Sequence, residues 1–379
     1  HTRYGTVTGV QTCALPISAL HTVVGIDHYL PFILIGRSRH WSLRKVLSLT
    51  ALCGVGHVVG SIVLGFLGIA AGLAIAERST LLVDLDPQAN LTSMFLDDDD
   101  LEKIWEGGGS AHTVTGCLAP LMEGTGDITQ PYVASITPQI GLMIGDLSLS
   151  SVEDELSCQW PDCLDRKARA FRVITSLWRM LEMGASQQRA DVVLIDVAPS
   201  LGALNRTALI AASHVVIPLV PDLYSIQGLK NLGPRLEVWR QEWGERLERN
   251  PVANLSMPEG KMIPSGYVVL QHAVRLDRPI KAYQRWLDRI PSVYRDSVLA
   301  VPATKGAIQA TPDNDPNCLA QLKHYRSLMP LAQEARKPMF MLTPADGALG
   351  GHFQAAQACR KEFRALAITL AERCSIPLP

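Results

Sequence analysis

The sequence contains little charge and no cysteine pattern that would build a stabilising framework. Asp, Glu, Lys and Arg make up only 19% of the 379 residues, hydrophobic residues make up 47%, and the formal net charge is −1. This composition excludes a disordered or fibrous chain, and DNA binding would need a local basic patch because the whole chain supplies no positive field. The eight cysteines are scattered, and the closest pair, Cys158 and Cys163, has no second pair at metal-ligand spacing. We therefore expect reduced, mostly buried thiols rather than a disulfide framework or a zinc site.

Lysine is missing over a long stretch, since none occurs between Lys45 and Lys103. Within that interval, residues 46–76 carry no Asp, Glu, Lys or Arg at all. This run exceeds the roughly 20 apolar residues that are needed to cross a bilayer. A basic cluster just before it would lie on the cytoplasmic side. The pattern therefore predicts a transmembrane segment over residues 46–76.

The chain divides into three segments of different texture. Residues 1–18 show no sustained period of 2 or 3.6 and are set apart as a leader that does not look native. Residues 19–76 form the apolar, transmembrane-like segment, which we expect to be helical. In residues 77–379 short apolar runs alternate with longer amphipathic stretches, such as 166–184 and 222–249, which predicts an α/β fold with a doubly wound, mainly parallel sheet. The strand candidates are 81–86, 141–146, 191–196, 214–220 and 266–272.

Two of these strands end in carboxylates. Asp84 and Asp86 stand at i and i+2 at the end of one apolar run, so we expect both to point to the same face. Four apolar residues lead to Asp196 at the end of another run, in the layout of a Walker-B strand. Ligands of open α/β sheets bind beyond the carboxyl ends of the strands, where such carboxylates suit Mg²⁺ or an attacking water. Either motif alone is also compatible with a structural strand end or a helix cap.

Taken together and in order, three segments resemble the ParA/Soj branch of the deviant-Walker ATPases. They are LLVDLDPQANLT, DVVLIDVAPSLGALN and HVVIPLVPDLYSIQGLKNL, and the resemblance extends over about residues 72–379. It implies a P-loop NTPase-like sheet, ATP and Mg²⁺ as cofactors, and a homodimer. It further implies that Asp86 positions the hydrolytic water, Asp84 supports the magnesium site and Asp196 holds Mg²⁺ as the Walker-B aspartate. Pro291, in a turn over residues 290–292, would lie on the adenine side.

The chain departs from this family at the phosphate-binding loop. Members of the family carry a first strand and a KGGVGKTT loop about twenty residues before the segment that matches LLVDLD, and its lysine reaches the β- and γ-phosphates. The nearest equivalent here is Gly54-Val55-Gly56-His57, which has no lysine and stands several residues too far upstream. The resemblance therefore predicts a ParA-like ATPase of DNA partition or cargo positioning that is inactive in this copy. Loss of the first strand, a central one in such sheets, would leave the neighbouring strands with unpaired edges.

The N-terminal segments show resemblances of their own. Residues 19–71 resemble the start of a membrane exporter of the TauE/SafE or urease-accessory type, and residues 1–18 resemble a translated sequencing adapter. Two alternatives to an inactive ParA-like ATPase therefore stay open. One is a fragment of a metal or sulfite exporter, and the other is a binding module that does not hydrolyse ATP. The expected location is cytoplasmic, or membrane-associated if residues 46–76 are genuine.

One helix is a candidate for DNA contact. The segment 222–249 places an apolar stripe on one face and five basic residues on the other, although four glutamates dilute that charge. Partition ATPases use basic surface residues for nonspecific DNA binding, so DNA and a partition or adaptor protein are the expected partners. A solvated helix face is the competing interpretation. The basic residues are Lys230, Arg235, Arg240, Arg246 and Arg249.

Overall fold

The structure, a computed structural model, describes residues 78–377 apart from 106–108, 273, 276–277, 280, 302–309, 324 and 326–327. The predicted leader over residues 1–18 and the apolar segment over residues 19–76 lie outside this range, as does the Gly54–His57 run. No helix among the described residues is long and apolar enough to cross a membrane.

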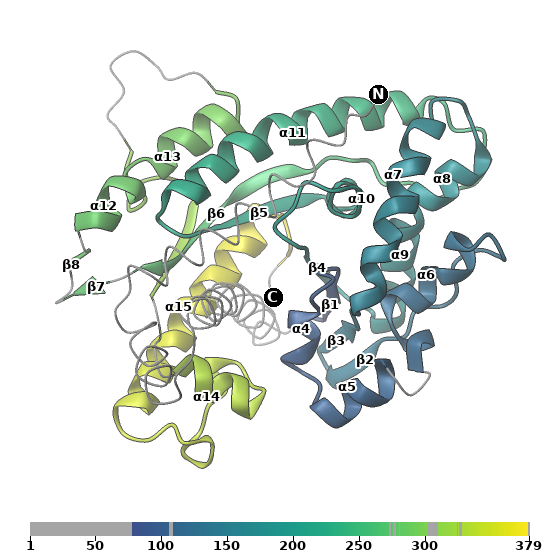
Figure 1. Ribbon diagram of the computed structural model, residues 1–379. Coiled ribbons are helices and arrows are strands. Elements are labelled where there is room, and N and C mark those ends of the chain that lie inside the picture. The colour runs from purple at the N-terminus through teal and green to yellow at the C-terminus, as the bar shows by residue number, and fades with distance from the viewer. Residues whose placement is uncertain are drawn as a thin grey trace, which may run out of the picture.

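Strands and helices alternate along the chain (Figure 1). The strands are β1 (Thr80–Asp84), β2 (Ala134–Thr137), β3 (Ile140–Met143), β4 (Val192–Asp196), β5 (His214–Leu219), β6 (Ile263–His272), β7 (Val274–Arg275), β8 (Arg278–Pro279) and β9 (Cys318–Lys323). The α-helices are α4 (Asn90–Ser93), α5 (Asp98–Trp105), α6 (Val114–Met122), α7 (Val152–Asp162), α8 (Ala168–Ile174), α9 (Ser176–Gln188), α10 (Ala203–Ala211), α11 (Leu223–Leu247), α12 (Lys281–Leu287), α13 (Ile290–Val293), α14 (Leu328–Ala335) and α15 (Gly351–Arg373). Short helical turns are η1 (Gly109–His112), η2 (Leu147–Ser151), η3 (Tyr294–Val298), η4 (Met339–Met341) and η5 (Pro344–Asp346).

The strands form two main sheets in the described part of the chain, with orders β2-β3-β1-β4 and β5-β6-β9. All pairings in these sheets are parallel except that of β2 with β3, which places an antiparallel strand on one outer edge. The short strands β7 and β8 pair separately. This arrangement confirms the predicted α/β class with a mainly parallel sheet.

Helices cover both faces of the strands. On one face α6 to α11 bury a large cluster that includes Val83 of β1 and Ile217 of β5. On the other face α4, α14 and α15 bury a second cluster around Leu82 and Val268. In Figure 1 α14 and α15 lie on one side of the strands, and α7, α9 and α11 lie on the other. A parallel sheet needs cover on both faces because βαβ connections place helices there, so the core is the three-layer sandwich expected of a doubly wound fold.

The five strand candidates correspond to β1, β3, β4, β5 and β6, with ends that differ by a few residues. The amphipathic stretch 166–184 falls in α8 and α9, and 222–249 falls in α11, whose apolar stripe is buried or half-buried as predicted. The patterns did not reveal β2 and β9. β2 is a four-residue edge strand of mixed burial, so it lacks the continuous apolar run that marks a buried parallel strand.

Candidate functional site

The carboxyl ends of β1 and β4 bring two of the predicted site residues side by side. β1 and β4 are parallel neighbours, and Asp84 is the register partner of Asp196. Register partners on adjacent strands point their side chains to the same face of a sheet. Both residues are buried, since Asp84 is 0% exposed and Asp196 is 5% exposed.

Asp84 is held by three hydrogen bonds from the protein. The backbone N–H and the hydroxyl of Thr92 donate to its Oδ2 at 2.8 and 2.7 Å, and the backbone N–H of Asp86 donates to Oδ1 at 3.2 Å. The Thr92 hydroxyl oxygen in turn accepts the N–H of Gly145 at 2.9 Å, which links the ends of β1 and β3. A Cβ at Gly145 would lie 2.9 Å from the Asp84 Cγ, so glycine permits this close approach. Asp84 is therefore held in place by hydrogen bonds to both of its carboxylate oxygens.

Asp86 lies in the turn after β1 and not in the strand, because β1 ends at Asp84. The expectation that both aspartates belong to one strand was wrong in this respect, yet the turn returns Asp86 to within hydrogen-bonding distance of Asp84. Its Oδ1 accepts the N–H of Gln88 at 2.9 Å, and Ala89 follows in the left-handed region with φ 51° at the start of α4. This tight turn keeps the Asp86 carboxylate at the strand ends.

The three carboxylates repel one another in a dry environment. Burial raises the pKa of Asp84 to about 6, against the hydrogen bonds from Thr92, and the charge of Asp86 raises it too. Burial also raises the pKa of Asp86. The pKa of Asp196 is raised well above its ordinary value by burial first, and then by the charges of Asp84 and Asp86. A cation at this place would relieve the repulsion.

The loop that follows Asp196 is fixed by two residues that the motifs did not single out. The carboxylate of Glu153, on α7, accepts the backbone N–H groups of Ala203 and Leu204 at 2.5 and 2.7 Å at the start of α10. Asn205, on α10, donates through Nδ2 to the carbonyls of Ala198 and Ser200. Glu153 lies 50 residues from Ala203 in the sequence, so no local pattern could have indicated its contact. Asn205 lies only five to seven residues from its partners.

A fourth buried carboxylate belongs to Asp146, which follows β3 and is 5% exposed. Its Oδ1 accepts the Thr115 hydroxyl at 3.0 Å and the N–H of Ser148 at 2.8 Å, while Oδ2 has no hydrogen-bond partner. Because β3 is parallel to β1, Asp146 also stands at the carboxyl edge. The apolar run that ends in Gly145-Asp146 could have identified it, since it has the same form as the runs before Asp84 and Asp196.

Pro291, predicted in a turn on the adenine side, lies in a short helix. It is buried in α13, which packs on α11, and in Figure 1 α13 lies beside the left-hand end of α11, away from β1 and β4. The predicted turn over residues 290–292 was therefore wrong, because residues 290–293 continue into a helical segment.

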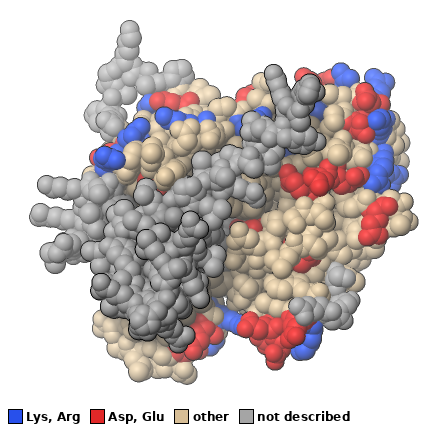
Figure 2. All heavy atoms as spheres, in the orientation of Figure 1, with Lys and Arg blue, Asp and Glu red and all other residues tan. Residues whose placement is uncertain are grey.

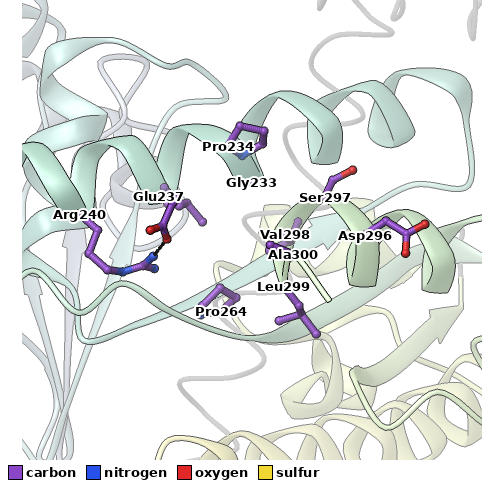
Figure 3. Close-up of a pocket in the computed structure, with 11 residues that line it drawn as sticks. Gly233, Pro234, Glu237, Arg240, Pro264, Asp296, Ser297, Val298, Leu299 and Ala300 are labelled. Carbon is purple, nitrogen blue, oxygen red and sulfur yellow. Dashed lines mark hydrogen bonds and ion pairs between the residues drawn. The ribbon is translucent and has the colours of Figure 1, made fainter. Parts of the chain in front are cut away.

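A separate cavity of about 570 Å³ lies between α11, η3 and the start of β6 (Figure 3). Its charged side chains are already engaged, since the Arg240 guanidinium contacts Glu237 at 2.5 Å and donates to the carbonyls of Lys261 and Met262. Helix α11 reaches η3 through Gly233, where a Cβ would lie only 1.8 Å from the Ser297 carbonyl oxygen. The cavity shares no residue with the carboxylate cluster, so it is not an extension of that site.

One of the five basic residues of the candidate DNA-binding face in segment 222–249 is buried. Arg246 is 4% exposed, with its guanidinium 4.0 Å from the centre of the Trp160 ring and its Nε donating to the Trp160 carbonyl. Arg249 donates to the carbonyl of Leu164. Figure 2 shows Lys and Arg mixed with Asp and Glu over the top of the molecule, where α11 runs. Packing against α7 therefore removes Arg246 from the candidate DNA surface.

The carboxylate cluster fits a hydrated divalent cation. Mg²⁺ in proteins is held by one or two carboxylates, with waters and phosphate oxygens in its other positions. Among the described residues, no group of three or more His, Cys, Asp or Glu side chains is arranged to hold a metal alone. Buried carboxylates at the strand ends have the chemistry to share Mg²⁺ with waters and a phosphate ligand, and the residues predicted to hold the ion are Asp196 and Asp84.

Comparisons with known proteins agree with the fold and the order of the motifs. The AAA_31 family profile, an AAA domain, matches residues 53–249, more than half of the chain. The sporulation initiation inhibitor protein Soj of Bacillus subtilis is 31% identical over 192 residues, 50% of this chain and 64% of Soj. The chromosome partitioning protein ParA of Myxococcus xanthus is 30% identical over 190 residues, 50% of this chain and 56% of ParA. The chain thus matches less than two thirds of the length of these relatives.

Two solved structures share the fold. Protein DIP2308 from Corynebacterium diphtheriae has a TM-score of 0.60 at 21% identity, over 83% of this chain and 94% of its own. A Cyanothece McdA variant in complex with ATP has a TM-score of 0.51 at 12% identity, over 83% of this chain and 93% of its own.

Proposed function

This chain belongs to the AAA_31 family of AAA domains, and from that premise we propose that it is a ParA/Soj-like ATPase domain of DNA partition or cargo positioning. The observation that carries the proposal is the pairing of Asp84 with Asp196 at the ends of adjacent parallel strands, with Asp86 in the next turn. In this proposal Asp196 holds Mg²⁺ through water, Asp84 supports that site and Asp86 orients the attacking water. Pro291 would contribute to the adenine side through the packing of α13.

We further propose that this copy does not hydrolyse ATP. The described carboxylates supply the acidic half of the site, whereas the phosphate half needs backbone N–H groups, a lysine and a hydroxyl. No lysine occurs between Lys45 and Lys103. The family match begins at residue 53 and so includes the Gly54–His57 run, which contains no lysine. Without a lysine, no ammonium group would reach the β- and γ-phosphates from this run.

A turnover assay tests this directly. The full chain with Mg²⁺ and ATP is expected to release no phosphate above a blank. Hydrolysis that disappears in the Asp86→Ala variant would contradict the proposed inactivity while supporting the role of Asp86.

A repaired chain tests the family assignment of the carboxylates. Residues 1–71 are replaced by an ordinary first strand and a KGGVGKTT loop, joined at Gly72. The repaired chain should bind ATP with Mg²⁺ and dimerise when the nucleotide is added. Asp196→Ala should abolish Mg²⁺-dependent binding, and Asp86→Ala should leave binding intact but stop turnover. A folded repaired chain that ignores ATP would mean that the carboxylates are only structural.

The partners follow from the same proposal. A homodimer is the expected assembly, with nonspecific DNA and a partition or adaptor protein as ligands and the cytoplasm as the location. Of the five basic residues in segment 222–249, Lys230 and Arg235 are the best candidates for DNA contact because both are exposed. Arg246 and Arg249 instead donate hydrogen bonds to the carbonyls of Trp160 and Leu164. Their replacement by Ala should weaken binding of a random DNA duplex and reduce its salt dependence.

A further inference from the structure

Helix α10 begins without a cap of its own. Its N-cap residue is Gly202, which has no side chain that could accept a hydrogen bond. Glu153 of α7 takes this role, because its carboxylate accepts the N–H groups of Ala203 and Leu204. A Cβ at Gly202 would lie 2.5 Å from the Glu153 Oε1, so glycine permits this approach. The bonds of Glu153 therefore fix the far end of the loop that runs from Asp196 to α10.

Arg206, one turn further along α10, has two unused hydrogen-bond donors. Its Nε and Nη2 atoms are buried and have no hydrogen-bond partner among the described residues. These two N–H groups form one edge of the planar guanidinium, and such an edge takes a carboxylate in a bidentate pair. Burial lowers the pKa of Arg206 to about 10, so the group is still charged at neutral pH. Buried charged donors without an acceptor are costly, so this edge is ready to receive a carboxylate.

Two carboxylates act on the charge of Arg206, that of Glu242 and, with a smaller effect, that of Glu153. Glu242 of α11 is already anchored, since its Oε2 accepts the Nε1–H of Trp160 at 3.2 Å. The Cζ of Arg206 lies 4.1 Å from the centre of the Trp160 ring. Glu153 and Trp160 stand seven residues apart on α7, which places them on one face of that helix, toward α10.

The carboxylate of Glu153 can reach Arg206 by a change of its own rotamer. Arg206 follows Ala203 by three residues, and neighbours at that spacing on a helix are only about 5–6 Å apart. A glutamate side chain can move its carboxylate over that distance while the two helices stay in place. Because the carboxylate cannot serve both sets of donors at once, the two arrangements exclude each other.

We propose that Glu153 alternates between two positions on α10 and thereby gives the loop after Asp196 two states. In the capped state, which is the one described above, the carboxylate binds the N–H groups of Ala203 and Leu204 and holds the loop. In the paired state it binds Nε and Nη2 of Arg206, and the end of the loop is released. Coupling between distant sites needs an element with two discrete arrangements, and this one lies between the carboxylate cluster and α11.

Amide hydrogen exchange of the full chain tests the paired state. Arg206→Lys keeps the positive charge but removes the bidentate edge, so the capped state should be favoured. Exchange at Ala203 and Leu204, relative to exchange at Leu209 and Ile210 in the last turn of α10, should slow by about threefold or more. This ratio cancels any loosening of the whole helix. If Arg206 only packs on the neighbouring ring, the ratio will stay the same or rise, and the proposal is overturned.

The Glu153→Gln background provides the matched control. A neutral amide has no charge to pair with the guanidinium, so Arg206→Lys should leave the exchange ratio unaltered in this background. An equal slowing with and without the Glu153 carboxylate would assign the effect to another group, such as Glu242, and would overturn the proposal.

Nuclear magnetic resonance of the full chain with ¹⁵N-labelled arginine observes the pair directly. The Nε–H signal of Arg206 is identified by its loss in Arg206→Lys. Gly202→Ala places a Cβ against the Glu153 carboxylate, so it should drive that group to Arg206 and move the Nε–H signal downfield. The double variant with Glu153→Gln should show no such shift.

An unmoved signal in folded Gly202→Ala would overturn the proposal. Should that variant not fold, the exchange ratio of Arg206→Lys still decides. None of these measurements uses ATP, so their failure is distinguishable from failure of the proposed function.

Discussion

Replacing Asp84 by Asn should stabilise the chain at neutral pH and flatten the dependence of its stability on pH. Asp84 is fully buried beside two other carboxylates. The substitution keeps the shape of the side chain and removes one negative charge from the cluster.

The magnitude follows from the pKa of Asp84. Burial raises this pKa from 3.8 to about 6, which corresponds to about 3 kcal/mol of unfavourable free energy when the group is ionised. The folded chain holds the proton to a higher pH than the unfolded chain does. Its stability is therefore greatest below about pH 4 and falls as the pH rises through about 6.

The amide recovers only part of this free energy. Its Oδ1 can accept both donors of Thr92, but its Nδ2 would then face the N–H of Asp86, which loses an acceptor. A buried N–H without a partner costs about 1–2 kcal/mol. We expect a net gain of about 1–2 kcal/mol at pH 7 and a loss of stability at pH 4.

Urea unfolding of the full chain, with EDTA present, measures both effects at pH 4 and pH 7. The exposed Asp99 on α5 provides the matched control, because Asp99→Asn makes the same chemical change outside the cluster and should leave the pH dependence unchanged. If Asp84→Asn lowers the stability at pH 7 and keeps the wild-type slope between pH 4 and 7, the argument from buried charge is refuted.

Three other substitutions test the surroundings of the site by the same unfolding measurement. Glu153→Ala removes both acceptors at the start of α10 and should lower the free energy of unfolding by about 1–2 kcal/mol. Glu153→Gln should lower it by less. Equal losses for the two variants would mean that the charge of Glu153 matters and its hydrogen bonding does not. Gly145→Ala places a Cβ 2.9 Å from Asp84 and should cost about 1–3 kcal/mol, whereas Gly228→Ala on α11, with nothing within 4 Å, should be neutral or stabilise by up to about 1 kcal/mol. Arg246→Ala should cost about 2 kcal/mol through lost packing on Trp160 without changing the salt dependence of DNA binding by the folded chain, and a changed salt slope would return Arg246 to the DNA surface.

Much of the fold follows from local patterns in the sequence. The apolar runs before Asp84 and Asp196 predicted two strands, and these strands are parallel neighbours. Such runs can be recognised because a parallel strand is buried on both faces and therefore tolerates few polar residues. The same reasoning placed both aspartates at the edge where ligands of α/β sheets bind. The buried stripe of α11 was equally evident, because its apolar residues recur with the helical period.

The remaining features depend on contacts between distant segments, which a local pattern does not encode. Glu153 resembles any glutamate in the first turn of a helix until α7 packs beside the start of α10. Arg246 resembles a surface cation until Trp160 covers it. The strand pairing shows the difference most clearly. The sequence by itself determined that no lysine occurs between Lys45 and Lys103. Only the tertiary structure decided that the described strands pair in the orders β2-β3-β1-β4 and β5-β6-β9, because the pairing of a strand is fixed by which neighbours share its two apolar faces.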